Sequence, residues 1–245
     1  MQIGRVLGIP IFLHWTFLGL LAGLLAWATW VGGVGALLPA ALVVGGVAGT
    51  VVLHELGHAV AAKRYGIGTA HITLYPFGGI AAIERMPEEP GQELVIALAG
   101  PAVNFALFAL LSLGGSVTGI ELLRLMGMMN LGMGLFNLIP AFPMDGGRVL
   151  RAALASRMGF VPASKLAIRI GTVFAWLFLI VGLYTWTPSL VMVGGFLHVA
   201  LRIERNRLIW TNYRDKTGFT PPWNPDDLWR RRSNSARVSH LFRRA

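Results

Sequence analysis

Long intervals without a charged residue divide the chain into apolar segments of membrane-spanning length. No charge occurs between Arg5 and His54, which leaves room for two spans of about 20 residues joined by a glycine-rich turn at residues 32–35. The whole pattern predicts an all-α polytopic membrane protein with about six transmembrane helices. They are expected at residues 11–30, at 37–62, between Glu93 and Glu121, between Arg124 and Ile139, at 164–184 and at 189–204.

Two features leave alternatives to this span count. Arg5 precedes the first apolar stretch and Ala26-Trp27-Ala28 resembles a signal-peptidase site, so a signal peptide is one alternative. We favour a retained span because residues 11–30 are longer than a usual signal-peptide core and contain His14. Short helices between residues 140 and 165 would also change the even count.

Residues 71–83 do not follow a helical pattern. They are rich in β-branched and aromatic residues, and Pro76 and Gly78-Gly79 provide a turn. We predict a membrane-associated β hairpin, which is too short to span the bilayer and must be covered by protein or line a cavity. A plain cytoplasmic loop is the alternative.

The composition supports a membrane protein. Hydrophobic residues make up 55% of the chain and charged residues 13%, against about 25% charged residues in an average soluble domain. This excludes an ordinary soluble globule and a disordered chain. Because the chain has 0 cysteines, disulfides, thiol catalysis and cysteine metal sites are also excluded.

The positive charge is concentrated at the C-terminal end. Residues 1–201 carry ten Lys/Arg and seven Asp/Glu, whereas residues 202–245 carry eleven and four. We therefore divide the chain into a transmembrane core at 1–205 and a basic cytoplasmic tail at 206–245, with both termini cytoplasmic by the positive-inside rule. Contact with anionic lipid explains the tail better than nucleic-acid binding, because no nucleic-acid motif accompanies it.

The second predicted span contains the motif His54-Glu55-Leu56-Gly57-His58. Positions i and i+4 share one face of a helix, so both imidazoles can bind one metal ion, and zinc suits such ligands. Glu55 lies close to that face and can act as general base towards a water molecule. Ionisable residues within a span usually mark a functional site; a buried polar cluster between helices is the alternative. Gly57 is expected to let a neighbouring helix approach.

A catalytic zinc needs a third protein ligand. Acidic residues follow the hairpin, and Asp145 follows an apolar span directly, after Pro140 and Pro143 break the helix. A carboxylate near membrane depth is costly unless it is paired or bound to a metal; an Asp that caps the next helix is the alternative. The candidates are Glu84, Glu88, Glu89, Glu93 and Asp145.

These motifs resemble the site-2 protease family of intramembrane zinc metalloproteases, in the compact prokaryotic form. The shared features are the membrane-embedded H-E-x-x-H, the N-x-x-P-x-x-P-x-D-G run from Asn137 to Gly146, and the G-P-x-x-N run from Gly100 to Asn104. The segment from Gly8 to Trp15 and Phe77-Gly78-Gly79 at the hairpin are also similar to that family. The resemblance covers roughly residues 5–205.

The resemblance implies a zinc site with assigned residues. His54, His58 and Asp145 would bind one Zn²⁺ per chain and Glu55 would be the base. Asn137 would act near the scissile peptide or the attacking water, and Asn104 would support the substrate or transition state, although an interhelical hydrogen bond explains Asn104 equally well. His14 is interpreted as a buried, hydrogen-bonded residue, and His71 and His198 are not expected to bind metal.

The implied activity is hydrolysis of peptide bonds in or next to transmembrane segments of membrane-anchored proteins, in a prokaryotic cell membrane. A non-catalytic metal-binding transporter or sensor is the alternative. We expect neither a PDZ nor a CBS domain, because the intervals leave no room for them and only about 40 residues follow the last predicted span. The substrate and the oligomeric state stay open.

Overall fold

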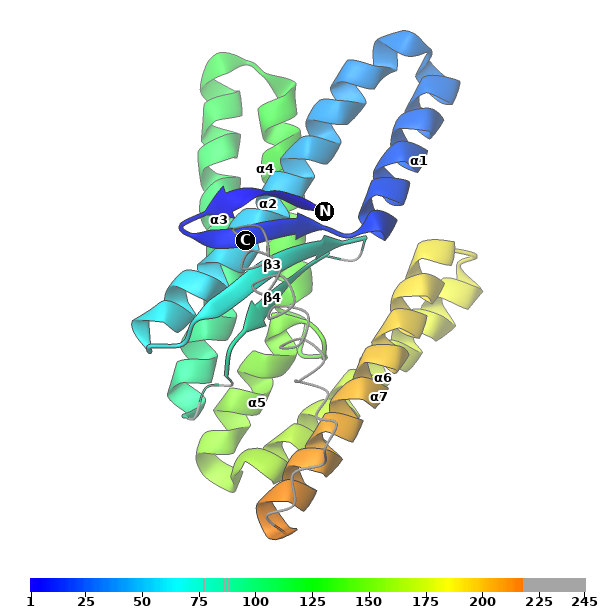
Figure 1. Ribbon diagram of the computed structural model, residues 1–245. Helices are drawn as coiled ribbons and strands as arrows, with labels where there is room; N and C mark the ends of the chain where they lie inside the picture. The colour runs from blue at the N-terminus through cyan, green and yellow to red at the C-terminus, as the bar shows by residue number, and fades with distance from the viewer. Residues whose placement is uncertain (77, 86, 88, 218–245) are drawn as a thin grey trace, which may run out of the picture. The chain divides into compact units, whose positions relative to one another are not determined.

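The computed structural model describes residues 1–217 except residues 77, 86 and 88. The described part is mainly helical, with four strands near the N-terminal end (Figure 1). A short 3₁₀ helix, η1, spans Val34–Ala36. The α-helices are α1 Trp15–Gly32, α2 Leu37–Arg64, α3 Pro90–Thr118, α4 Glu121–Asn137, α5 Asp145–Met158, α6 Phe160–Tyr184 and α7 Pro188–Thr217. The strands are β1 Gln2–Val6, β2 Ile9–Leu13, β3 Thr69–Tyr75 and β4 Gly78–Ile83.

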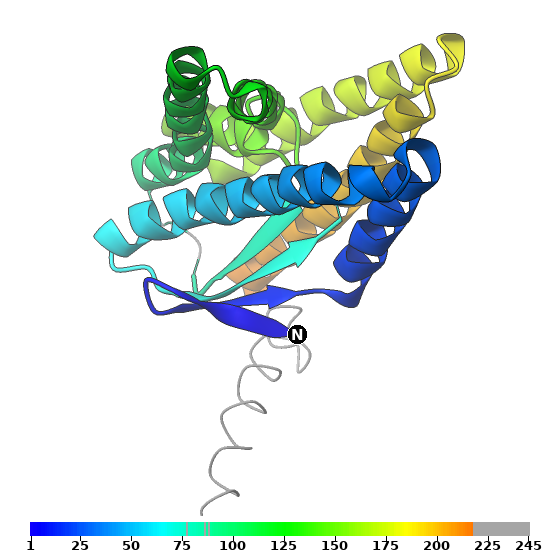
Figure 2. The same ribbon diagram turned by 90° about the horizontal axis from the view of Figure 1, so that it is seen from above.

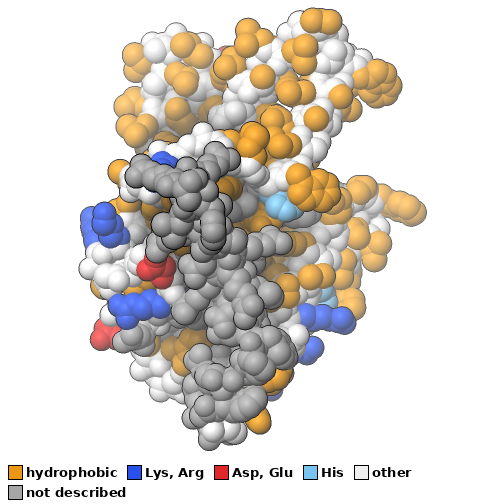
Figure 3. Space-filling view, viewed as in Figure 1, with side chains coloured by type: hydrophobic (Ala, Val, Ile, Leu, Met, Phe, Trp, Pro, Cys, Tyr) orange, Lys and Arg blue, Asp and Glu red, His pale blue; other side chains and the backbone are white. Residues whose placement is uncertain are grey.

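Four helical segments in the described part of the chain are long and apolar enough to cross a membrane: residues 15–32, 34–64, 90–118 and 160–184. Helices α4 and α7 occupy the places of two further predicted spans but are not among these four. The expectation of about six spans therefore stays a prediction. On the face drawn in Figure 3, hydrophobic side chains cover most of the upper ends of the helices, whereas Lys and Arg side chains lie lower.

The strands form one sheet in the order β1-β2-β3-β4. The predicted hairpin at residues 71–83 corresponds to β3 and β4, which pair antiparallel. The fold is therefore not purely α-helical, and the first span begins at Trp15 instead of residue 11. Residues 2–13 form a second hairpin whose turn contains Leu7 and Gly8, both at positive φ. Strand β2 then pairs in parallel with β3, which joins the two hairpins.

Helix α2 is packed against α3 on one side and against β3 and β4 on another (Figure 2). Gly57 permits the close approach of α3, since a Cβ there would lie 2.8 Å from the carbonyl oxygen of Ala99. At the end of α2 an apolar core forms around Ala61, Ala62, Ile67 and Ile96. This packing holds the second half of α2 between a helix and a sheet, which positions the residues at 54–58.

The chain divides into two compact units, residues 1–204 and residues 205–245. In the first unit α6 and α7 approach closely at glycines, because a Cβ on Gly194 would lie 2.9 Å from the carbonyl oxygen of Ala175. In the second unit, residues 205–217 continue the helix α7. Most of the predicted basic tail at 206–245 lies outside the described residues.

Candidate metal centre

Two buried histidines of α2 point to one place. His54 and His58 are separated by one helical turn, and their side chains are 4% and 5% exposed. Their Nε2 atoms lie 3.1 Å apart. The i, i+4 spacing thus places both imidazoles on one face, as the helical pattern predicts.

Asp145 completes the cluster from a distant part of the sequence. Its Oδ2 atom lies 3.1 Å from Nε2 of His54 and 3.2 Å from Nε2 of His58. Asp145 is the first residue of α5, and the N-cap position belongs to Met144. The carboxylate therefore faces the histidines and is not the cap of α5, which was the alternative interpretation.

Two glycines allow α5 to start so close to the loop that precedes it. A Cβ on Gly147 would lie 2.6 Å from the backbone nitrogen of Phe142, and a Cβ on Gly146 would overlap the carbonyl oxygens of Leu138 and Ile139. Real Cβ contacts are not this short. The Asp145-Gly146-Gly147 sequence therefore lets the loop fold back on the helix and directs Asp145 towards α2.

Helix α3 orients both imidazoles through their other ring nitrogen. Nδ1 of His54 lies 2.6 Å from Oδ1 of Asn104, and Nδ1 of His58 lies 2.7 Å from the carbonyl oxygen of Ile96. Because oxygen acceptors face both Nδ1 atoms, each Nδ1 carries the proton and each Nε2 keeps a lone pair. Asn104 thus contacts a histidine directly, which agrees with an interhelical hydrogen bond.

The three converging atoms fit a metal ion. Oδ2 of Asp145 is buried without a hydrogen-bond partner, and both Nε2 atoms present lone pairs, so three electron-pair donors face one another. A buried arrangement of this kind is costly unless a cation lies between the donors. Tetrahedral zinc with ligand distances of about 2.0–2.1 Å separates neighbouring ligand atoms by about 3.3 Å, close to the separations here. In the described part of the chain, these residues form the one group suited to a metal.

Glu55 lies on α2 beneath the strand β4. A Cβ on Gly79 would lie 2.5 Å from Cγ of Glu55, so the strand passes close over this side chain. The backbone N–H of Ala81 lies beside the carboxylate of Glu55. The predicted base and the edge of the sheet are therefore in direct contact.

The other candidate residues lie elsewhere. Glu93 bonds to Arg151, Glu84 and Glu89 are exposed, and Glu88 is not among the described residues. Asn137 donates a hydrogen bond from Nδ2 to the carbonyl oxygen of Met133 in its own helix, so its expected role stays a prediction.

Three further histidines are absent from the described metal-binding group. His14 is half-buried and N-caps α1, with Nδ1 2.7 Å from Oγ1 of Thr16. His71 on β3 packs against Phe12, and burial lowers its pKa below the ordinary value. Nδ1 of His198 on α7 lies 3.1 Å from the carbonyl oxygen of Gly194. The sequence pattern does not predict that the carbonyl oxygen of Ile96 and the close contact at Gly100 support the histidines, since neither feature has a side-chain signature.

The chain belongs to peptidase family M50. The family model matches residues 42–119 and 116–178, which include both histidines and Asp145. Among solved structures, the chain is similar to the site-2 protease from Methanocaldococcus jannaschii, with a TM-score of 0.64 and 35% identity over 83% of this chain and 94% of that chain. The predicted resemblance to the site-2 protease family is thus confirmed.

Two curated relatives agree with this assignment. A zinc metalloprotease of Methanocaldococcus jannaschii is 37% identical over 89% of this chain and 65% of its own length. Stage IV sporulation protein FB of Bacillus subtilis is 30% identical over 52% of this chain and 45% of its own length. The chain therefore spans less than two thirds of the length of these relatives.

Substitution of Gly100 by alanine tests the packing of α3 on the centre. A Cβ at this position would lie 2.5 Å from Cε1 of His58 and 2.7 Å from Nε2 of His54, so it would displace the imidazoles. We predict that Gly100→Ala weakens zinc binding at least as much as loss of an outer-shell partner does, by about 10- to 100-fold, measured by chelator competition on the purified protein.

Gly114→Ala is the matched control on the same helix. Its Cβ would meet only Cδ1 of Leu123, at 3.7 Å, which is an ordinary contact, so zinc binding should stay at the wild-type level. Equal zinc affinities for the two variants would contradict the placement of α3 against the imidazoles.

Proposed function

We propose that this protein is an intramembrane zinc metalloprotease that hydrolyses peptide bonds in or next to transmembrane segments of membrane-anchored substrates. It would hold one Zn²⁺ per chain through His54, His58 and Asp145. The observation that carries the proposal is the convergence of these three ligand atoms on α2 and α5, next to Glu55, in a chain with four candidate membrane spans among its described residues.

The residues of the site divide the chemistry between them. His54, His58 and Asp145 would hold the zinc ion, which when bound would act as a Lewis acid on the scissile carbonyl and would lower the pKa of a water molecule towards neutrality. Glu55 takes the proton from the attacking water and delivers it to the leaving amine. Asn104 and the carbonyl oxygen of Ile96 keep the two imidazoles in the tautomer that binds metal.

The free edge of β4 supports a way to present the substrate. A helical segment uses its backbone carbonyls in bonds between residues i and i−4, so the scissile segment has to be extended before it can react. Strand β4 is the last strand of the sheet, and Ala81 contacts Glu55. An extended substrate that adds to this edge would therefore lie beside the base.

The surroundings of the protein follow from the same pattern. The substrates are membrane-anchored proteins, and the transmembrane core is surrounded by the lipid bilayer of a prokaryotic cell. The basic residues favour cytoplasmic termini and contact of the tail with anionic lipid. A transporter or sensor would need ionisable groups along a path across the membrane. Among the described residues the metal-binding candidates form a single group, which does not favour a transporter or sensor.

Removal of the base separates catalysis from metal binding. We predict that Glu55→Gln lowers cleavage by about 10²- to 10⁴-fold, the usual contribution of a general base, while zinc content stays at the wild-type level. Cleavage is measured as the accumulation of uncleaved membrane-anchored proteins in cells that carry the variant, and zinc by metal analysis of the purified protein.

The exposed Glu121 on α4 provides the same chemical change away from the site. Glu121→Gln should leave cleavage and zinc content unchanged. Wild-type cleavage by Glu55→Gln would refute the assignment of Glu55 as the base.

The edge of β4 is tested by removal of one backbone N–H. The N–H of Ala81 faces Glu55 and not β3, so an added substrate strand would take over this donor. Ala81→Pro removes it while the rest of the ladder is retained. We predict that Ala81→Pro raises KM for a membrane-anchored substrate about tenfold, the effect of losing roughly 1.4 kcal/mol of binding, with unchanged zinc content.

Ala81→Val is the control, because valine keeps the N–H and favours a strand. It should cleave like the wild type. If Ala81→Pro also kept the wild-type KM, binding of the substrate at this edge would be wrong.

A further inference from the structure

A buried cluster of charges joins three helices near the centre. Arg151 of α5 is 4% exposed. Its Nε atom donates to Oε1 of Glu93 on α3 at 3.1 Å, its Nη2 also donates to that carboxylate, and its Nη1 donates to Oε1 of Glu204 on α7 at 2.7 Å. Nε of Arg148 lies 3.9 Å from Oε1 of Glu93. The two arginines thus balance the negative charges of Glu93 and Glu204.

Two aromatic rings enclose the same guanidinium. Its Cζ atom lies 4.9 Å from the ring centre of Phe142 and 5.0 Å from that of Phe160. Both distances are within the range of a cation–π contact. Phe142 is itself buried and stands three residues before Asp145, in the loop that packs on Gly147. Arg151 therefore holds the segment that positions Asp145.

The partner of Arg151 on α3 belongs to the face that orients the histidines. The buried positions of α3 near its start are Glu93, Ile96, Ala97, Gly100, Pro101 and Asn104, which is one helical stripe. Ile96 and Asn104 accept from the two imidazoles. One rigid helix face thus carries the supports of both histidines and, one turn earlier, the carboxylate that binds Arg151.

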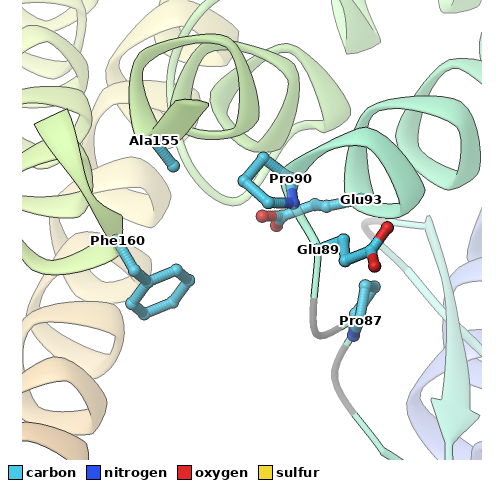
Figure 4. Close-up of a pocket in the computed structure, with 6 residues that line it drawn as sticks. All are labelled: Pro87, Glu89, Pro90, Glu93, Ala155 and Phe160. Carbon is cyan, nitrogen blue, oxygen red and sulfur yellow. The ribbon is translucent and has the colours of Figure 1, made fainter. Parts of the chain in front are cut away.

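A pocket of about 210 Å³ opens beside Glu93, lined by Pro87, Glu89, Pro90, Glu93, Ala155 and Phe160. Figure 4 shows side chains of α3, α5 and α6 around this space. Glu93 thus lines this pocket and also binds Arg151.

We propose that Arg151 is a positioning residue for the metal ligand Asp145, and that Glu204 makes this positioning depend on α7. Arg151 fixes the loop at Phe142 relative to α3, which carries the supports of His54 and His58. A shift of α7 that removes Glu204 would loosen Arg151 and displace Asp145 from the two Nε2 atoms. Zinc affinity would then depend on the contact between Glu204 of α7 and Arg151 of α5.

This inference rests on the proposed zinc site but not on proteolysis, so its test uses metal binding alone. The full chain is purified in detergent, stripped of metal and titrated with Zn²⁺ against a chelating dye. Co²⁺ is then bound in place of zinc, because its visible absorption reports the ligand geometry. The variants are Arg151→Met, Arg151→Lys and Glu204→Gln, with Arg157→Met as control on an exposed residue of the same helix.

We expect the zinc Kd to rise about 10- to 100-fold in Arg151→Met, the usual effect of losing an outer-shell partner. Arg151→Lys should be intermediate, since an ammonium keeps the charge but not the planar fork. Glu204→Gln should raise Kd about threefold to tenfold, and Arg157→Met should bind like the wild type. The Co²⁺ spectrum should change with Kd, and Phe142→Leu combined with Glu204→Gln should give a non-additive effect.

Loss of a buried ion-pair partner can unfold a protein, so circular dichroism of each metal-free variant is measured first. If Arg151→Met does not fold, Glu204→Gln decides, because it leaves Arg151 paired with Glu93. A zinc Kd within twofold of wild type in folded Glu204→Gln, with an unchanged Co²⁺ spectrum, would overturn the proposal. So would a lower melting temperature with unchanged zinc affinity, because that is the result of a purely structural role.

Discussion

The structure depends on one electrostatic constraint: three electron-pair donors meet among buried side chains. The two Nε2 atoms and Oδ2 of Asp145 lie 3.1–3.2 Å apart, a distance at which like partial charges repel. A cation removes this cost, and a buried site without one would be destabilised. Gly100, Gly146 and Gly147 leave the space that the backbone needs to bring the donors together, since a Cβ at each would overlap neighbouring atoms.

Helix α3 connects the local and the distant parts of this arrangement. One face of the helix supports both imidazoles, contacts them through Gly100, and ends in Glu93, which binds Arg151 of α5. Helix α2 supplies two donors, α5 supplies the third, and α3 sets the distance between them. The sheet covers the other side of α2 and brings Gly79 and Ala81 over Glu55, so the metal and the extended substrate that we propose would lie on adjoining sides of one helix.

Local periodicity explains which features can be predicted from the sequence. The pairing of His54 with His58 follows from helical spacing alone, and the hairpin of β3 and β4 from its β-branched residues and turn. The N-terminal hairpin is hidden, because the apolar residues of β2 adjoin those of α1 and appear as one hydrophobic run. The carbonyl of Ile96 is also hidden, since every residue has one. The sequence pattern places Asp145 among five possible third ligands, and only the resemblance to a family selects it, because contacts between α2 and α5 are not local.

The most direct test of the account is X-ray absorption at the zinc edge on the purified full chain, together with metal analysis. We predict one zinc per chain, with two imidazole nitrogens and a carboxylate oxygen among its ligands at about 2.0–2.2 Å, and loss of that coordination in Asp145→Ala. Zinc that is absent from the wild-type protein, or a spectrum that is the same in Asp145→Ala, would contradict the assignment of these three residues as its ligands.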